Sequence, residues 1–163
     1  MTDQAKRDIE SIRRQEELLV FETFDQNTAW QLGSLLRERA VNQNWPIVID
    51  IRAGETPLFY AALPGTTPAN SDWARRKRNL VNKLEISSYA INLHSETDFD
   101  AIKAMALDPR DHAAAGGCVP IRVKGAGMVA TCTVSGLPQR DDHKVVVEAI
   151  ADLLGVSIGD AAL

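Results

Sequence analysis

PIVIDIR, residues 46–52, alternates between two sets of side chains with a period of two residues. One set is Ile47, Ile49 and Ile51, and the other is Val48, Asp50 and Arg52. Because successive side chains of an extended chain point to opposite faces, this alternation predicts a half-buried β-strand. Gly54 permits a turn, and residues 57–63 are predicted to return as a second strand. The stretch therefore predicts an antiparallel hairpin.

A second hairpin is predicted further along the chain. Residues 118–123 and 128–134 have the composition of strands, and the segment KGAG, 124–127, separates them. Segments with helical periodicity surround both hairpins, and the apolar run 18–21 predicts a further strand. Hairpins separated by helices are typical of α+β proteins with an antiparallel sheet. A doubly wound parallel sheet would instead alternate single strands with single helices.

Two helices on the C-terminal side of the first hairpin have recognisable starts. Ser71 or Asp72 is predicted to cap a helix that begins near Trp73. Pro138 suits the first turn of the last helix, and Gly155 suits its end. These helices frame the second hairpin in the sequence.

Length and charge limit the classes of protein that fit. The 163 residues include 18 Lys and Arg against 22 Asp and Glu, a net charge of −4, which argues against a broad nucleic-acid surface. No apolar run is long enough for a membrane span or a secretory signal. Two cysteines make neither a disulfide framework nor a zinc site. We expect one cytoplasmic domain over residues 1–163, with residues 1–17 as a peripheral helix and no membrane or nucleic-acid partner.

Two familiar motifs do not carry their usual chemistry here. The segment GAGMVA, 125–130, matches the dinucleotide pattern, but that pattern needs a helix after the glycines, and a strand is predicted instead. The three histidines form no metal-binding motif. His143 shares a helical stripe with apolar residues, which favours a structural role. His112 lies in a loop before a glycine pair and is the better site candidate.

The densest group of charges in the sequence is Arg75, Arg76, Lys77 and Arg78. In the predicted helix these residues fall in the first turns, where cations oppose the helix dipole. Such a run is most often a solvated helix face, but arginine forks also hold carboxylates and phosphates. Arg122 on a strand could join them, or could pair with an acid or another subunit. The candidate ligand-binding residues are Arg75, Arg76, Lys77, Arg122, Gly116, Gly117 and His112, the glycines because they permit close approach.

Two blocks of sequence resemble a known family. They are NSDWARRKRN (70–79) with the later Ser87-Ser88, and GGCVPIRVKG (116–125) with TVSGLPQ (133–139) and Asp142-His143. From about residue 18 to residue 154 the chain is similar to a small bacterial and fungal branch of the haem-degrading-domain superfamily, which includes the HbpS-like and GlcG-like proteins. The resemblance implies a five-stranded antiparallel sheet flanked by helices, built from the two hairpins plus strand 18–21, and a homo-oligomer.

The resemblance also implies haem binding or haem degradation in some members. In relatives we expect a histidine directly before the glycine pair, and here that position is Ala115. The nearest histidine is His112. This departure argues against a histidine-based haem or catalytic role, so no catalytic residue is assigned by the resemblance.

Three functions are therefore compared. We favour a non-catalytic, homo-oligomeric protein that binds a small ligand, either haem or an anionic metabolite, through the cations and the glycine pair. The alternative is an assembly or adaptor protein, in which Trp30, Trp45 or Trp73 would anchor contacts with partners. An enzyme acting on haem or a small organic acid is less well supported, because no base–nucleophile pair is visible.

Overall fold

A five-stranded sheet, in the order β1-β4-β5-β2-β3, is the centre of the computed structural model, which describes residues 2–95 and 99–163. The strands are β1 (Val20–Phe21), β2 (Val48–Ala53), β3 (Thr56–Ala62), β4 (Cys118–Val123) and β5 (Gly127–Ser135). Both predicted hairpins are present, as β2–β3 and β4–β5, and β5 also pairs with β2. The predicted α+β class is confirmed.

One pair of strands corrects the prediction of a wholly antiparallel sheet. β1 runs parallel to β4, with Val20 opposite Arg122 and Phe21 opposite Val123. The reason is topological, because β1 belongs to neither hairpin and is followed by a helix rather than a tight turn. No turn therefore imposes an antiparallel direction on this strand, and the sheet is mixed.

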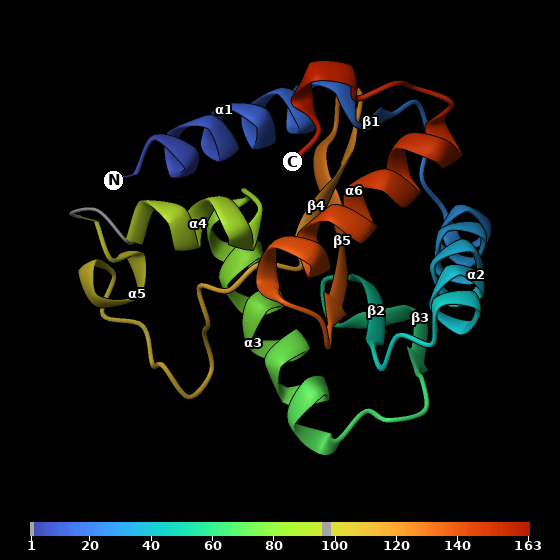
Figure 1. Cartoon of the computed structure of the whole chain (residues 1–163), viewed down its shortest axis with the longest axis horizontal. Helices are drawn as coiled ribbons and strands as arrows, with labels where there is room; N and C mark the ends of the chain where they lie inside the picture. Colours follow the sequence, from blue (N-terminus) through green and yellow to red (C-terminus); the bar gives the residue numbers. More distant parts are fainter. Residues whose placement is uncertain (1, 96–98) are drawn as a thin grey trace.

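Helices cover both faces of the sheet (Figure 1). The helices are α1 (Asp3–Leu18), α2 (Gln26–Gln43), α3 (Pro68–Leu84), α4 (Ser88–Ser95), α5 (Ala101–Ala104), α6 (Gln139–Leu154) and the short 3-10 helix η1 (Gly159–Ala161). α2 and α6 pack on one face and α3 on the other, while α1 lies beside α4 and η1. In the part of the chain that the structure describes, no helix is both long and apolar enough to cross a bilayer.

The alternation in β2 explains this layered arrangement. Ile49 and Ile51 of β2, and Ile47 just before it, are completely buried in the core under α2 and α6, as predicted. The opposite side was predicted to be exposed, but Asp50 is only 2% exposed. α3 covers it, and the Arg78 guanidinium donates a 2.6 Å hydrogen bond to the Asp50 carboxylate. The charged residue Asp50 can thus be buried because the cation of Arg78 compensates its charge.

The start of α3 differs from the prediction by more than a turn. The helix begins at Pro68 with Thr67 as its N-cap, and the Thr67 N–H donates to the Asn70 side chain at 2.8 Å. Pro68 occupies the first turn of α3, a position that favours proline. Arg75–Arg78 therefore lie beyond the first turn, and the expected conflict with the helix dipole does not arise.

Gly33 allows α2 to lie directly over β3. A Cβ atom at this position would overlap the Phe59 ring, so a larger residue would force the helix away from the strand. One turn earlier, the Trp30 ring meets the same phenylalanine edge to face, with 5.5 Å between centroids. Trp30 is nevertheless 64% exposed, so its outer face has no cover in the described chain.

A buried polar contact fixes α1 to the rest of the molecule. The Gln15 amide donates to the Ala161 carbonyl at 2.6 Å, so its oxygen is left to accept from His143 Nε2 at 2.9 Å. His143 is completely buried, and no described residue pairs with its Nδ1. The structural role predicted for His143 is consistent with this position. Burial lowers the pKa of His143 from 6.5 to about 3.

The lowered pKa of His143 predicts that stability falls as the solution is acidified. Between about pH 6.5 and about pH 3 the unfolded chain binds a proton at His143 that the folded chain does not, so the free energy of unfolding decreases by up to about 1.4 kcal/mol per pH unit. Urea unfolding at about pH 7.5, 6 and 5 measures this slope. In the His143→Gln variant the contribution is absent, so the slope should be smaller between pH 6.5 and 5. Equal slopes for both proteins would contradict the assignment.

Candidate functional site

The two sequence blocks that carry the family resemblance meet at one small pocket. It has a volume of about 280 Å³ and lies where α3, the loop before β4, the end of β5 and the start of α6 come together. The lining residues are Asn70, Trp73, Lys77, Ala115, Ser135, Gly136, Leu137, Gln139 and Asp142. We call this the α3–α6 pocket.

A buried ion pair forms part of the pocket wall. Lys77 Nζ lies 2.9 Å from Asp142 Oδ2 and donates to the Val134 carbonyl at 3.2 Å. Both residues are almost fully buried, at 3% and 2% exposure. An ammonium group has three N–H donors, and the described residues accept from two of them. The third N–H of Lys77 has no partner among the described residues.

Asp142 connects the ion pair to the loop between β5 and α6. Its carboxylate accepts from the Leu137 N–H at 2.9 Å and, more weakly, from the Gly136 N–H at 3.4 Å. Burial raises the pKa of the Asp142 carboxyl, while Lys77 and the two backbone donors act in the opposite direction. The carboxylate thus holds the loop and the lysine in one arrangement.

The glycine pair allows the chain to approach this ion pair closely. Gly117 has φ of 126°, and a Cβ there would lie 2.8 Å from Lys77 Nζ. A Cβ at Gly116 would overlap the Gln139 carbonyl. The Gly116 N–H donates to the Gln139 side chain at 3.2 Å. The close approach predicted for these glycines is an approach to α3 and α6 of the same chain, and it brings the two blocks together.

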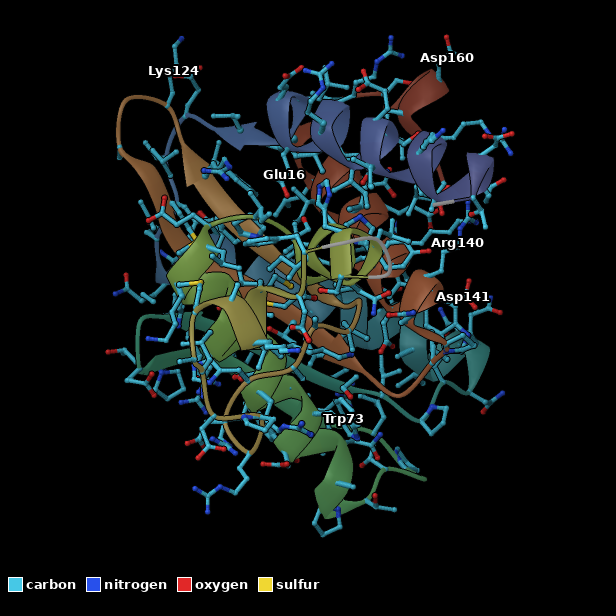
Figure 2. The ribbon with its side chains drawn as sticks, turned by 90° about the vertical axis from the view of Figure 1, so that its left-hand side faces the viewer. Glu16, Trp73, Lys124, Arg140, Asp141 and Asp160 are labelled. Atoms are coloured by element: carbon cyan, nitrogen blue, oxygen red, sulfur yellow. The ribbon has the colours of Figure 1, made fainter. Side chains whose placement is uncertain are left out.

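The mouth of the pocket carries an aromatic ring. Trp73 is 42% exposed, and the Arg76 guanidinium lies 4.6 Å from its ring centroid. Figure 2 shows Trp73 on α3, well below α1 in that view. α6 begins at Gln139, and its N-cap Pro138 provides no side-chain hydrogen bond, so the positive end of the helix dipole is close to Gln139 in the pocket wall. The pocket therefore combines an apolar rim with polar groups of both signs.

Two of the predicted arginines, Arg75 and Arg76, bind a loop next to the pocket. Arg75 pairs with Asp111 at 2.8 Å, and Arg76 donates to the Pro109 carbonyl at 2.7 Å. His112 lies in the same loop, where its Nδ1 is 3.0 Å from the Asp108 carbonyl. The structure brings these three predicted residues together beside α3, but only Lys77 among the predicted cations lines the pocket.

Arg122 is far from the pocket. It pairs with Glu16 of α1 at 3.4 Å and donates to the Glu85 carbonyl. Figure 2 shows Glu16 in the upper part of the molecule and Trp73 in the lower part. The structure therefore does not place Arg122 with the other candidate ligand-binding residues.

Sequence reasoning missed the acidic member of the site. In the sequence Asp142 is noted only as part of a block that carries the family resemblance, whereas in the structure it is the buried partner of Lys77. A usable signal exists, because Asp142, Val146 and Ala149 fall on one helical stripe. An acid on an apolar stripe predicts a buried carboxylate that needs a cation.

Neither cysteine contributes a nucleophile. Cys118 and Cys132 are completely buried and free of disulfides. Burial raises the pKa of Cys118 to about 12, so its thiol stays protonated at neutral pH. Across residues 2–95 and 99–163, no group of three or more His, Cys, Asp or Glu could hold a metal ion.

Removing one partner of the ion pair should strongly destabilise the protein. In Lys77→Met the Asp142 carboxylate is left buried without its cation, at a cost of about 3–5 kcal/mol. The double variant Lys77→Met/Asp142→Asn removes both charges and keeps an acceptor for Leu137, so its loss should be smaller than the sum of the single losses. Urea unfolding of the wild type, both single variants and the double variant measures the coupling. Additive losses would show that the two side chains do not interact.

Comparisons with known proteins agree with the fold. A UPF0303 protein from Acidobacterium capsulatum is 53% identical over 150 residues, which are 91% of each chain. The crystal structure of Ybr137w protein superposes with a TM-score of 0.83 at 24% identity, over 90% of this chain and 87% of that one. The PduOC:Heme complex superposes with a TM-score of 0.65 at 18% identity, over 81% and 94%. Residues 24–151 match the family described as haem degrading protein HbpS-like, and the chain belongs to that family.

Proposed function

We propose that the protein binds a small carboxylate-bearing metabolite in the α3–α6 pocket, without catalysing its conversion. The observation that carries the proposal is that Lys77, in the wall of a pocket built from both family blocks, uses only two of its three N–H donors among the described residues. A ligand carboxylate could accept from the third donor, and the amino end of α6 would add to the attraction. Because Asp142 already compensates the charge of Lys77, the ligand would also need a group that donates hydrogen bonds, such as a hydroxyl.

The residues around the pocket support this class of ligand. Ser135 and Gln139 offer a hydroxyl and an amide on one wall, and Asn70 offers a second amide on the other. Trp73 at the mouth can cover an apolar part of the ligand. A volume of about 280 Å³ matches a molecule of a few carbon atoms better than a large cofactor.

Haem, which the family description suggests, does not fit the α3–α6 pocket. Haem iron is held in proteins by His, Cys, Met or Tyr. None of the described lining residues is of these types, and Ala115 occupies the position before the glycine pair. His112 is held in its own loop by the Asp108 carbonyl, and His143 is completely buried. No role in this pocket is therefore assigned to haem.

The proposal includes self-association and a cytoplasmic location. An exposed tryptophan beside a sheet edge favours contact between subunits, since aromatic residues are enriched in interfaces. Two buried, reduced cysteines are consistent with a reducing compartment.

Fluorescence titration tests the ligand directly. Lactate, malate and citrate, added separately to the wild-type protein, are the carboxylate probes, and haemin is the competing probe. At least one hydroxy acid should change tryptophan emission saturably, because Trp73 lies at the mouth of the pocket. Trp73→Phe should lose the change in emission, and Ser135→Ala should weaken binding about tenfold, since one hydrogen bond to a charged group is lost.

The control is Trp45→Phe, which alters a tryptophan outside this pocket and should keep the response. No saturable response to any of the three acids would contradict the proposal. A stoichiometric Soret shift with haemin that competes with the acids would show that haem uses the pocket after all.

A further inference from the structure

We infer that the outward face of α2 and the free edge of β3 together form a two-fold interface with a second copy of this chain. The inference rests on the self-association proposed above and specifies its surface and symmetry. It is independent of the α3–α6 pocket, which lies beside α3 and α6.

The first observation is a stripe on the exposed side of α2. Its members are Trp30, Ser34, Arg37 and Val41, spaced by four, three and four residues. This spacing places side chains on one side of a helix and is the spacing of helix–helix seams. Trp30 and Val41 are 64% and 49% exposed, although both are large and apolar.

The second observation is that the stripe borders a groove along an unpaired strand. β3 is the outermost strand of the sheet, and its far edge has no neighbour among the described strands. The groove between β3 and α2 has a volume of about 680 Å³ and is lined by Trp30, Val41, Leu58 and Phe59, among others. Figure 1 shows α2 and β3 along the same side of the molecule. Exposed sheet edges are normally paired or covered, so we expect a partner to cover the free edge of β3.

The charges on α2 identify the partner as a second copy. Arg37 and Glu38 are adjacent members of the groove wall, and neither forms an ion pair within the described chain. If two α2 helices align antiparallel about an axis passing between these residues, Arg37 of each copy faces Glu38 of the other. The same alignment puts Ser34 opposite Val41, a small residue against a larger one.

Other partners fit this surface less well. A strongly acidic or basic partner would meet one favourable and one unfavourable charge, whereas a two-fold pairing satisfies both. In an isologous contact each feature is used twice, so the surface must complement itself. The α2 stripe meets this condition, and the β3 edge meets it too, because two copies of one strand pair antiparallel across a two-fold axis.

A charge swap tests the interface. Sedimentation equilibrium of the full chain should give a dimer or a larger assembly for the wild type. Arg37→Glu and Glu38→Arg each place like charges opposite each other, and each should raise the dissociation constant about tenfold or more. The double variant Arg37→Glu/Glu38→Arg restores opposite charges and should regain most of the affinity. Trp30→Ala should weaken association by about tenfold as well, since it removes an aromatic anchor.

Lys103→Glu, an exposed charge reversal on α5, is the matched control and should leave the mass unchanged. Circular dichroism of each variant confirms that the fold is kept. A wild type that stays monomeric at high concentration would overturn both this inference and the proposed self-association. An assembly unaffected by all of these changes would overturn the α2–β3 interface alone, and hydroxy-acid binding would still report separately on the pocket.

Discussion

The ion pair between Lys77 and Asp142 joins parts of the chain that are far apart in the sequence. Lys77 belongs to α3 on one face of the sheet, and Asp142 belongs to α6, which packs on the other face. The pair lies at the end of β5, where the Val134 carbonyl accepts from the same lysine. Two charges this deeply buried must remain together, because either one alone would lose its hydration without compensation. The position of the pocket depends on that requirement.

The need to pair buried charges also applies to the rest of the sheet face that α3 covers. Arg78 reaches the Asp50 carboxylate one residue after Lys77 in α3, so the helix is held over the sheet by two buried ion pairs. The core under α2 and α6 is built from apolar side chains, with Ile49 and Ile51 of β2 and the preceding Ile47 at its centre. Apolar burial supplies a large, non-directional stabilisation there, whereas the paired charges select one position of α3. A site formed between α3 and α6 is thereby held in a single geometry.

Much of this fold could be predicted from local patterns. Alternation predicted the first hairpin and strand-like composition the second, and Gly155 ends α6 in the left-handed conformation expected of it. The parallel pairing of β1 was beyond reach, because two residues with no tight turn carry no information about direction. The start of α3 was misplaced since proline both ends loops and begins helices. Among the candidate residues, Lys77 lines the pocket and the glycine pair lies beside it. Arg75, Arg76 and Arg122 instead bind acids or carbonyls that are distant in the sequence, and no local pattern predicts those partners.

The ammonium group of Lys77 offers the most direct measurement. Exposed lysine ammonium protons exchange rapidly with water, whereas those of a buried, hydrogen-bonded group are protected. Nitrogen-15 NMR of the side-chain amines at neutral pH should therefore show one slowly exchanging lysine ammonium, assigned to Lys77 and lost in Asp142→Asn. If the ammonium protons of every lysine exchange rapidly with water in the wild-type protein, the buried ion pair does not exist. The pocket described around that pair would then be contradicted as well.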